Sequence, residues 1–482
     1  MSASATAPID VAAWIEQHQR KDLLRLLTCG SVDDGKSTLI GRLLYDTDNV
    51  YEDHLAALRR DSGKHGTTGQ GNVDLALLTD GLKAEREQGI TIDVAYRYFS
   101  TDRRKFIIAD CPGHEQYTRN MATGASACDL AIILMDARPG HGMMEQTRRH
   151  SAIVHLLGIR HVVLAINKMD CVGWAQERYR ELEGAYRAFA ASIGLPEVTC
   201  IPMSALTGEN VAGPAPSAPW YAGPTLLQHL ERVPVGDAVN RADFRFPVQF
   251  VLRPDLNFRG FSGTVASGSV AVGDAIAVLP ANREAVVRRI VTFSGDRDRA
   301  EAGEAVTLCL DREVDASRGD VLVPAAARPA VTSRVVCDVV WMHDDELSTG
   351  RSYLVRTVAG FVPGQVVRVV DALDLASQRR VPAATVGLNR IARIELETVR
   401  PLVLEPYARN RATGALVLVD RVHHATMAAG MVIECLPATA SDPGAPVRAA
   451  AEDLVEALRG LGGSAPDPAT AALLARVKSL IG

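Results

Sequence analysis

The chain contains 482 residues, 47% of them hydrophobic and 23% charged, and its formal net charge at pH 7 is −5. This length predicts about three domains, and the acidic balance argues against a nucleic-acid or acidic-membrane partner. The eight cysteines include no C-x-x-C pair, which argues against a zinc site or a disulfide framework. Because neither a signal peptide nor a membrane-spanning run is found, we expect a cytoplasmic protein with no membrane partner.

The first strong pattern is an apolar run at 23–29, followed by a Gly-rich turn and by helical spacing from 38 to 44. The turn fits G-x-x-x-x-G-K-[ST], which predicts a phosphate loop whose backbone N–H groups surround an anion. Lys36 is expected to reach the β and γ phosphates, and Ser37 to ligate Mg²⁺. The expected nucleotide-binding residues here are Gly30, Ser31, Val32, Asp33, Asp34, Gly35, Lys36, Ser37 and Thr38.

A long polar interval at 45–89 includes a helical stretch, 73–86, and an insert of this length is usually functional. Two strands are predicted after it, at 90–99 and 105–109. Thr91, near the start of the first, is expected to complete the Mg²⁺ coordination only when a γ-phosphate is present, which would make it part of a nucleotide switch. The alternative is that these residues simply begin a strand.

The second of these strands leads into Asp-Cys-Pro-Gly-His at 110–114. Asp110 can hold Mg²⁺ through water, the Gly113 N–H can meet the γ-phosphate, and His114 can position the attacking water. The sequence therefore predicts two overlapping sets: Lys36, Thr91, Gly113 and His114 for catalysis, and Ser37, Thr91 and Asp110 for the metal.

Strands and helices then alternate, which predicts an α/β domain with a mostly parallel sheet and helices on both faces. Ligands of such sheets lie beyond the carboxyl ends of the strands, where the motifs fall. The predicted strands are 130–135, 161–166 and 198–201, and the predicted helices are 145–157, 175–193 and 225–232.

Two further motifs indicate that the nucleotide is GTP. Asn167-Lys168-Met169-Asp170 follows a strand, and the Asp170 carboxylate can accept two hydrogen bonds that guanine offers and adenine does not. The Asn167 amide is expected to tie loops together, and the Lys168 stem to lie across the base. After the next strand, Ser204-Ala205-Leu206 is expected to offer a backbone N–H to the guanine O6.

Beyond residue 244, short Val- and Ile-rich runs separated by turns predict two β-barrels. A basic cluster there, Arg283, Arg288 and Arg289, is interpreted as a solvated strand face. The pair His423-His424 is interpreted as surface or packing residues, because no further metal ligands have suitable spacing. The predicted domains are a GTP-binding P-loop domain at 1–237, β-barrels at 241–328 and 329–437, and a helical tail at 438–482.

The first 235 residues resemble the GTPase domain of the translation-factor class. Within that class the chain most closely resembles the large, GTP-binding subunit of the heterodimeric bacterial sulfate adenylyltransferase, over roughly residues 20 to 436. Elongation factors typically have His where this chain has Ser31, and Asp34 and Ser37 also resemble the sulfate enzyme. The other segments that carry the resemblance are 84–99, 110–126, 146–150, 167–170, 258–268 and 410–416.

This resemblance implies a GTPase subunit that couples GTP hydrolysis to the synthesis of adenylylsulfate from ATP and sulfate. The adenylation itself would occur on a separate small catalytic subunit, in a heterodimer that serves sulfate assimilation and cysteine biosynthesis. The implied cofactors are GTP and Mg²⁺. This chain has no S-G-G-x-D-S-like pyrophosphate loop, so it is not expected to activate sulfate alone.

The resemblance also implies roles for single residues. Val32 and Ile90 would form a hydrophobic gate beside His114, and Asp33 would lie near the β–γ bridge and help to hold a monovalent cation. Two positions depart from the family pattern. Cys111 replaces the usual Thr and leaves the backbone role intact, whereas Arg356 replaces an expected Lys.

Two other classes of function stay open at this point. One is a translation elongation-factor-like GTPase that carries aminoacyl-tRNA, and the other is a stand-alone regulatory GTPase. Only Ser31, the resemblance of the β-rich segments and the negative net charge separate the sulfate hypothesis from these two.

Overall fold

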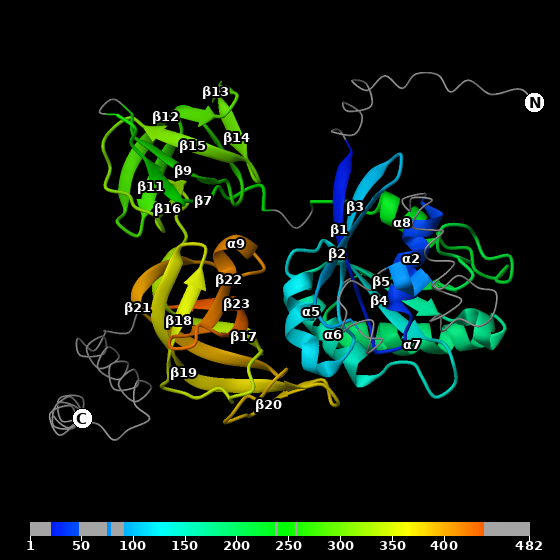
Figure 1. Ribbon diagram of the computed structural model, residues 1–482. Coiled ribbons are helices and arrows are strands. Elements are labelled where there is room, and N and C mark those ends of the chain that lie inside the picture. Colours follow the sequence, from blue (N-terminus) through cyan, green and yellow to red (C-terminus); the bar gives the residue numbers. More distant parts are fainter. Residues whose placement is uncertain are drawn as a thin grey trace, which may run out of the picture. The chain divides into compact units, whose positions relative to one another are not determined.

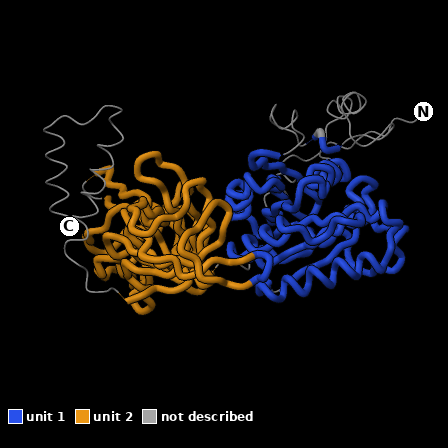
Figure 2. The backbone as a smooth tube through the Cα atoms, turned by 90° about the horizontal axis from the view of Figure 1, so that it is seen from below, with its two compact units in different colours: residues 1–238, 375–378 blue, residues 239–374, 379–482 orange. Residues whose placement is uncertain are grey.

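The computed structural model describes residues 21–47, 75–78, 91–195, 197–236, 240–255 and 258–437. The chain forms two compact units, Met1–Ala238 with Leu375–Gln378 and Val239–Asp374 with Arg379–Gly482 (Figure 2). The expected helix at 73–86 (apart from 75–78), the gate residue Ile90 and the tail lie outside the described residues. Within the described ranges, no helix is long and apolar enough to cross a membrane.

A six-stranded sheet in the order β2-β3-β1-β4-β5-β6 forms the centre of the first unit (Figure 1). Its strands pair in parallel except for β2, which runs antiparallel to β3 at one edge. Every residue of the central strand β4 is buried, as expected for a strand covered on both faces. The strands are β1 (Asp22–Cys29), β2 (Ala95–Ser100), β3 (Arg104–Asp110), β4 (Leu130–Asp136), β5 (His161–Asn167) and β6 (Glu197–Pro202).

Helices α2 and α8 share one apolar core cluster with these strands, and α6 contacts β4 while α7 contacts β5 and β6. Thr225 caps α8 in a reciprocal capping box with Gln228, which fixes where that helix begins. The helices are α2 (Lys36–Asp46), α5 (Thr118–Ala125), α6 (Glu145–Leu156), α7 (Gln176–Ile193) and α8 (Leu226–Arg232), and the short 3₁₀ turns are η1 (Leu75–Leu78), η2 (Glu115–Tyr117) and η3 (Met169–Val172). The predicted P-loop α/β fold is confirmed.

Two local expectations differ from the structure. The strand predicted over 90–99 begins only at Ala95, and Thr91 lies in irregular backbone before it. Helix α5, which contains Gly124, was not among the predicted helices. The structure gives this glycine a packing reason, since a Cβ at Gly124 would lie 2.7 Å from the Cys111 Sγ.

The second unit begins with an eight-stranded antiparallel sheet in the order β7-β16-β11-β12-β15-β9-β8, with β13 paired to β12. Its inward side chains form one apolar cluster that includes Phe246 and Ile290. The strands in this part are β7 (Phe246–Pro247), β8 (Phe250–Leu252), β9 (Gly260–Thr264), β10 (Ser269–Ala271), β11 (Ala275–Leu279), β12 (Arg283–Thr292), β13 (Gly295–Arg297), β14 (Arg299–Glu301), β15 (Ala305–Leu310) and β16 (Val321–Pro324).

The rest of this unit is a second antiparallel sheet in the order β18-β22-β23-β17-β21-β19-β20. An additional pairing between β18 and β19 closes it into a barrel around buried residues such as Trp341 and Tyr353. The two predicted β-barrels are thus confirmed, while the four domain boundaries stay predictions. The elements are β17 (Ala330–Trp341), β18 (Ser352–Thr357), β19 (Gly360–Asp374), β20 (Arg379–Val381), β21 (Ile391–Leu404), α9 (Arg411–Gly414), β22 (Ala415–Asp420) and β23 (Thr426–Leu436).

A buried ion pair joins the two barrels within this unit. The guanidinium of Arg245 donates through Nε and Nη2 to the two carboxylate oxygens of Glu405, each at 2.8 Å. Arg245 is fully buried and Glu405 is 2% exposed. Thr413 Oγ1 donates a further hydrogen bond to Glu405, and Asn410 Nδ2 donates to Ser267 Oγ. Because each charge is desolvated and depends on its partner, this contact fixes one barrel against the other.

Candidate functional site

The phosphate loop joins β1 to α2 through backbone that only glycine adopts easily. Gly30 and Gly35 have φ of +153° and +92°. A Cβ at Gly35 would lie 2.5 Å from Asn167 Nδ2, and one at Gly113 would lie 2.4 Å from Lys36 Nζ. The absence of a Cβ at Gly35 and Gly113 therefore lets the side chains of Asn167 and Lys36 pack directly against the backbone beside the N-terminus of α2.

Lys36 is buried within this loop and donates from Nζ to the carbonyl oxygens of Gly30, at 3.2 Å, and Ser31, at 2.7 Å. Burial lowers its pKa, and the nearby carboxylates of Asp34 and Asp110 oppose that shift. Burial also raises the pKa of the Asp34 carboxyl to about 7, although Lys36 and a 2.6 Å hydrogen bond from the Ser31 N–H favour its charged form. The phosphate loop thus places the Lys36 side chain near a titratable carboxyl, that of Asp34.

Asp110 ends β3, and the parallel register pairs it with Thr28 of β1, two residues before the phosphate loop. Its carboxylate is almost fully buried and accepts a 3.5 Å hydrogen bond from Thr28 Oγ1. Ser37, the second residue of α2, adds a hydroxyl oxygen directly after the loop. A carboxylate and a hydroxyl are ligands of the type that Mg²⁺ prefers when it also binds phosphate oxygens and water.

These residues therefore fit a magnesium ion that is held jointly with a nucleotide. Among the described residues, no group of three or more His, Cys, Asp or Glu side chains is arranged to hold a metal by itself. Thr91, the third predicted ligand, is half-buried. It lies in the segment just before Ala95, the β2 residue that pairs with Asp110.

His114 is exposed and lies directly after Gly113, at the start of η2. Its Nδ1 accepts a 3.3 Å hydrogen bond from the Gln116 N–H, so the proton of the neutral ring lies on Nε2. The preceding turn is held by Gln146 of α6, whose side-chain amide donates to the Gly113 carbonyl. Val32, proposed as one half of the gate, is 38% exposed.

Asn167 connects the phosphate loop to the loop after β6. Its Nδ2 donates to the Asp34 carbonyl at 2.8 Å, and its Oδ1 accepts from the Ala205 N–H at 2.9 Å. Lys168 has φ of +62° and donates from Nζ both to the Asp33 carbonyl and to Asp136. The side chain of one residue thus sets the spacing between the phosphate loop and the Ser204–Leu206 segment.

Asp170 is the residue expected to read the base. In the described part of the chain its buried Oδ1 has no hydrogen-bond partner, while Oδ2 accepts a 3.5 Å contact from the neighbouring Cys171 thiol. A buried, unsatisfied carboxylate oxygen costs free energy unless a ligand satisfies it. The Asp170 carboxylate, with this oxygen unsatisfied, is therefore suited to accept hydrogen bonds from the paired N–H donors of a guanine.

His150 of α6 is a buried residue near the site to which the sequence motifs assigned no role. Within the described structure neither ring nitrogen has a hydrogen-bond partner. Burial, together with the positive charges of Lys36 and Arg149, lowers its pKa to about 3. The only sequence feature that singled out His150 was its position in segment 146–150, one of the segments that carry the family resemblance. That position did not indicate that the side chain is buried.

The shifted pKa of His150 predicts a specific pH dependence of stability. In the unfolded chain His150 binds a proton below about pH 6.5, whereas in the folded chain it stays neutral down to about pH 3. Its contribution to stability is therefore lost as the pH falls through this window. His150→Gln should reduce the difference in unfolding free energy between pH 7.5 and pH 5 by about 2 kcal/mol. Denaturant titrations at both pH values, each compared with the native chain, measure this; equal pH differences would contradict it.

The histidine pair and the arginine cluster, both interpreted from the sequence as residues without a binding role, differ in the structure. His423 and His424 are both exposed. Arg288 and Arg289 line a hollow in the first barrel, so the interpretation of a plain solvated strand face is incomplete for them.

Comparison with known proteins assigns the fold to a class. Residues 21–245 match the family model of the Elongation factor Tu GTP binding domain, and residues 334–433 match that of the GTP-eEF1A C-terminal domain-like family. The chain is therefore a GTP-binding protein of the translation-factor class. A solved structure of Sup35 complexed with GDP is 26% identical, covers 86% of this chain and 95% of its own, and has a TM-score of 0.39.

Within this class the chain belongs to the family of sulfate adenylyltransferase subunit 1. The protein of that name from Teredinibacter turnerae is 53% identical over 90% of this chain and 92% of its own length. The one from Citrobacter koseri is 54% identical over 90% and 91%. The bifunctional enzyme CysN/CysC of Rhodopirellula baltica is 54% identical over 88% of this chain and 66% of its own length. These relatives support the sulfate hypothesis over the translation-factor alternative.

Proposed function

We propose that this chain is the GTPase subunit of sulfate adenylyltransferase and couples GTP hydrolysis to the formation of adenylylsulfate from ATP and sulfate. The observation that carries the GTP-binding part is the buried Asp170 oxygen, which has no hydrogen-bond partner among the described residues and follows the Asn167 that joins two loops. Similarity of more than 50% to proteins named sulfate adenylyltransferase subunit 1 supports the sulfate part. The name of these relatives supports a partner subunit, and the proposed partner is a small catalytic subunit in a cytoplasmic heterodimer.

In the proposed site, Lys36 would exchange its contacts with the Gly30 and Ser31 carbonyls for the β- and γ-phosphate oxygens. The N–H of Gly113 would donate to the γ-phosphate. Mg²⁺, held by Ser37, Thr91 and Asp110, would supply positive charge at the oxygens that become more negative in the transition state. In the conformation described, His114 offers Nε2–H and would orient the attacking water as a donor.

A physical reason for the coupling lies in the adenylation itself. Exchanging a phosphoanhydride of ATP for the sulfate–phosphate anhydride is uphill unless pyrophosphate is removed, so a second hydrolysis can drive it. In this proposal, this chain hydrolyses GTP and the partner subunit carries out the adenylation of sulfate.

The coupling is tested by mixing the purified chain with a candidate small catalytic subunit and following sulfate-dependent pyrophosphate release. We expect release to rise when GTP is added and to lose this increase when GTP is replaced by a non-hydrolysable analogue. Absence of both a complex and any GTP dependence would overturn the proposal. Tight, salt-sensitive binding of tRNA would favour the carrier alternative instead.

The base-reading assignment makes a separate prediction. Asp170→Asn replaces an acceptor-only carboxylate by an amide that also donates, and xanthosine offers a carbonyl where guanosine has its 2-amino group. The ratio of affinities for GTP and xanthosine triphosphate should shift by about a hundredfold toward the xanthine nucleotide. Equilibrium binding of both nucleotides to the native chain and the variant measures the ratio. An unchanged ratio would show that another residue reads the base.

A further inference from the structure

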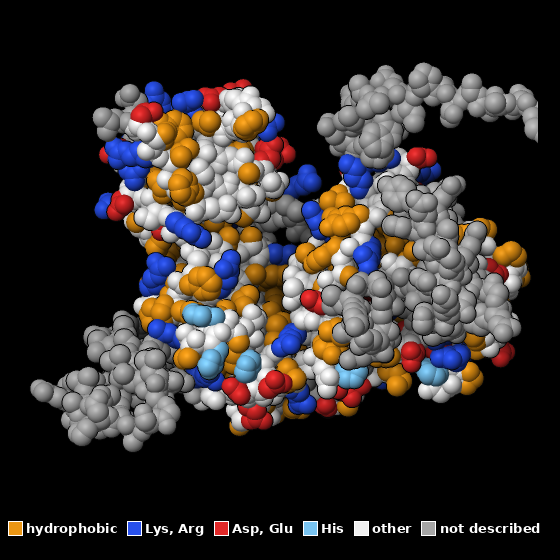
Figure 3. All heavy atoms as spheres, viewed as in Figure 1, with side chains coloured by type: hydrophobic (Ala, Val, Ile, Leu, Met, Phe, Trp, Pro, Cys, Tyr) orange, Lys and Arg blue, Asp and Glu red, His pale blue; other side chains and the backbone are white. Residues whose placement is uncertain are grey.

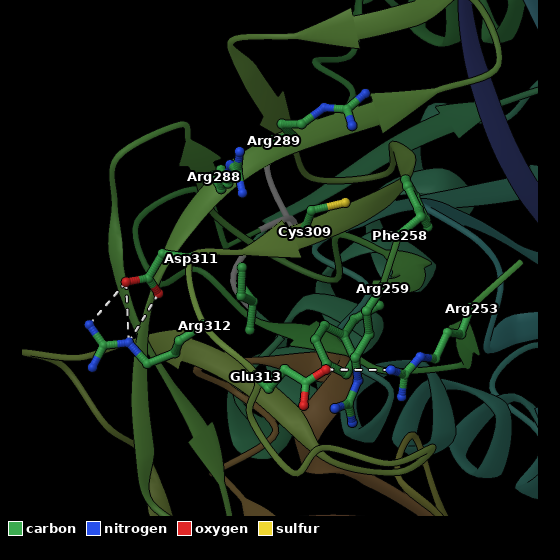
Figure 4. Close-up of a pocket in the computed structure, with 11 residues that line it drawn as sticks. Arg253, Phe258, Arg259, Arg288, Arg289, Cys309, Asp311, Arg312 and Glu313 are labelled. Carbon is green, nitrogen blue, oxygen red and sulfur yellow. Dashed lines mark hydrogen bonds and ion pairs between the residues drawn. The ribbon is translucent and has the colours of Figure 1, made fainter. Parts of the chain in front are cut away.

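A hollow of about 260 Å³ opens on the first barrel of the second unit, well away in sequence from every residue of the nucleotide site (Figure 4). Its charged lining is dominated by five arginines, Arg253, Arg259, Arg288, Arg289 and Arg312, against only two carboxylates. Such an excess of positive charge is local, because the chain as a whole carries a net charge of −5. Figure 3 shows charged side chains of both signs on the face of this barrel that it presents.

The carboxylates of the hollow are already engaged with neighbouring arginines. Asp311 pairs with Arg312 at 2.9 Å, and Glu313 pairs with Arg253 at 3.5 Å. Arg289 pairs with Asp296, which does not line the hollow. Two guanidinium groups therefore remain to attract an anion.

Those two groups belong to Arg259 and Arg288. Among the described residues neither forms an ion pair or a hydrogen bond through its guanidinium, although that of Arg259 lies 5.6 Å from the centre of the Phe261 ring. An aromatic ring restricts the motion of a guanidinium without occupying its five N–H donors. Both groups thus keep their donors for a ligand.

The backbone gives a reason for the unusual pair Arg288-Arg289. Regular alternation along β12 would turn one of two adjacent side chains into the core. Instead the pairing with β15 shifts register between Val287 and Arg289, and both arginines are exposed while Val287 and Ile290 are buried. β-Bulges re-aim side chains in this way and often lie beside functional sites.

We propose that this hollow binds a small, multiply charged tetrahedral oxyanion of the sulfate or phosphate class. Guanidinium forks match such oxyanions with two parallel hydrogen bonds, and a concave wall of one charge raises the local anion concentration. The hollow is smaller than sites for drug-sized ligands, which begin at about 300 Å³. The proposal rests on the hollow alone and does not depend on the GTPase assignment.

The test is isothermal titration calorimetry of the full chain with its nucleotide site saturated by GDP. Sulfate, pyrophosphate and adenosine 5′-monophosphate are titrated separately, so that the tightest ligand distinguishes a free inorganic anion from the phosphate of a nucleotide. Arg259→Gln and Arg288→Gln should each weaken binding about tenfold, whereas Arg288→Lys, which keeps the charge but loses the fork, should fall between.

Arg283→Gln is the matched control, since Arg283 is an exposed arginine of the same strand that does not line the hollow. It should leave the dissociation constant unchanged. The proposal is overturned if none of the three anions binds when GDP fills the nucleotide site. It is also overturned if Arg283→Gln weakens binding as much as Arg288→Gln, because the effect would then be one of overall charge.

Discussion

His114→Ala is expected to lower the rate of GTP hydrolysis about a thousandfold and to leave the affinity for GTP nearly unchanged. Positioned side chains that orient a reacting water typically contribute factors of about 10² to 10⁴. His114 follows Gly113, whose carbonyl is held by Gln146, and its own ring caps η2, so its position is defined by the fold. Single-turnover hydrolysis and equilibrium nucleotide binding, measured on the same preparation, separate the two effects.

His423→Ala is a suitable control, because His423 is an exposed histidine of the second unit. It should hydrolyse GTP at the native rate. A His114→Ala chain that keeps its full rate would remove His114 from the mechanism. A variant that loses affinity and rate together would show that His114 serves the architecture of the loop instead.

Glu405→Ala is expected to destabilise the second unit by about 3–5 kcal/mol. The substitution leaves the Arg245 guanidinium fully buried without its counter-charge, which costs more than the pair itself contributes. Denaturant unfolding followed by a probe in this unit measures the change. The double variant Arg245→Met/Glu405→Leu should recover most of the loss, because it removes both charges from the interior.

A surface ion pair provides the contrast. Arg297 pairs with Glu304 at 2.6 Å, but its side chain is 52% exposed. Arg297→Ala should therefore change the unfolding free energy by less than about 1 kcal/mol. Equal losses in Glu405→Ala and Arg297→Ala would show that the contact between the barrels contributes little to stability.

Much of the first unit could be predicted from the sequence, because its signals are local. Buried parallel strands appear as short apolar runs, and the run 130–135 became the wholly buried β4. The phosphate loop, Asp110 and Asn167 each follow such a run directly, so predicting the strands also located the motifs. The β-rich second half and its division into two barrels followed from turn spacing in the same way.

The tertiary structure alone decided which distant residues meet. Arg245 and Glu405 are 160 positions apart, and neither neighbourhood signals a buried charge. The positive charge of Lys36 acts on His150 although the two belong to different helices, and the register shift in β12 leaves the neighbours Arg288 and Arg289 both exposed beside the hollow. The sequence by itself determined a GTP-binding α/β domain, the identity of its motifs and two barrels, since these depend on local pattern. Only folding determined burial, charge pairing and the arginine-lined hollow, since these depend on where separate strands come to lie.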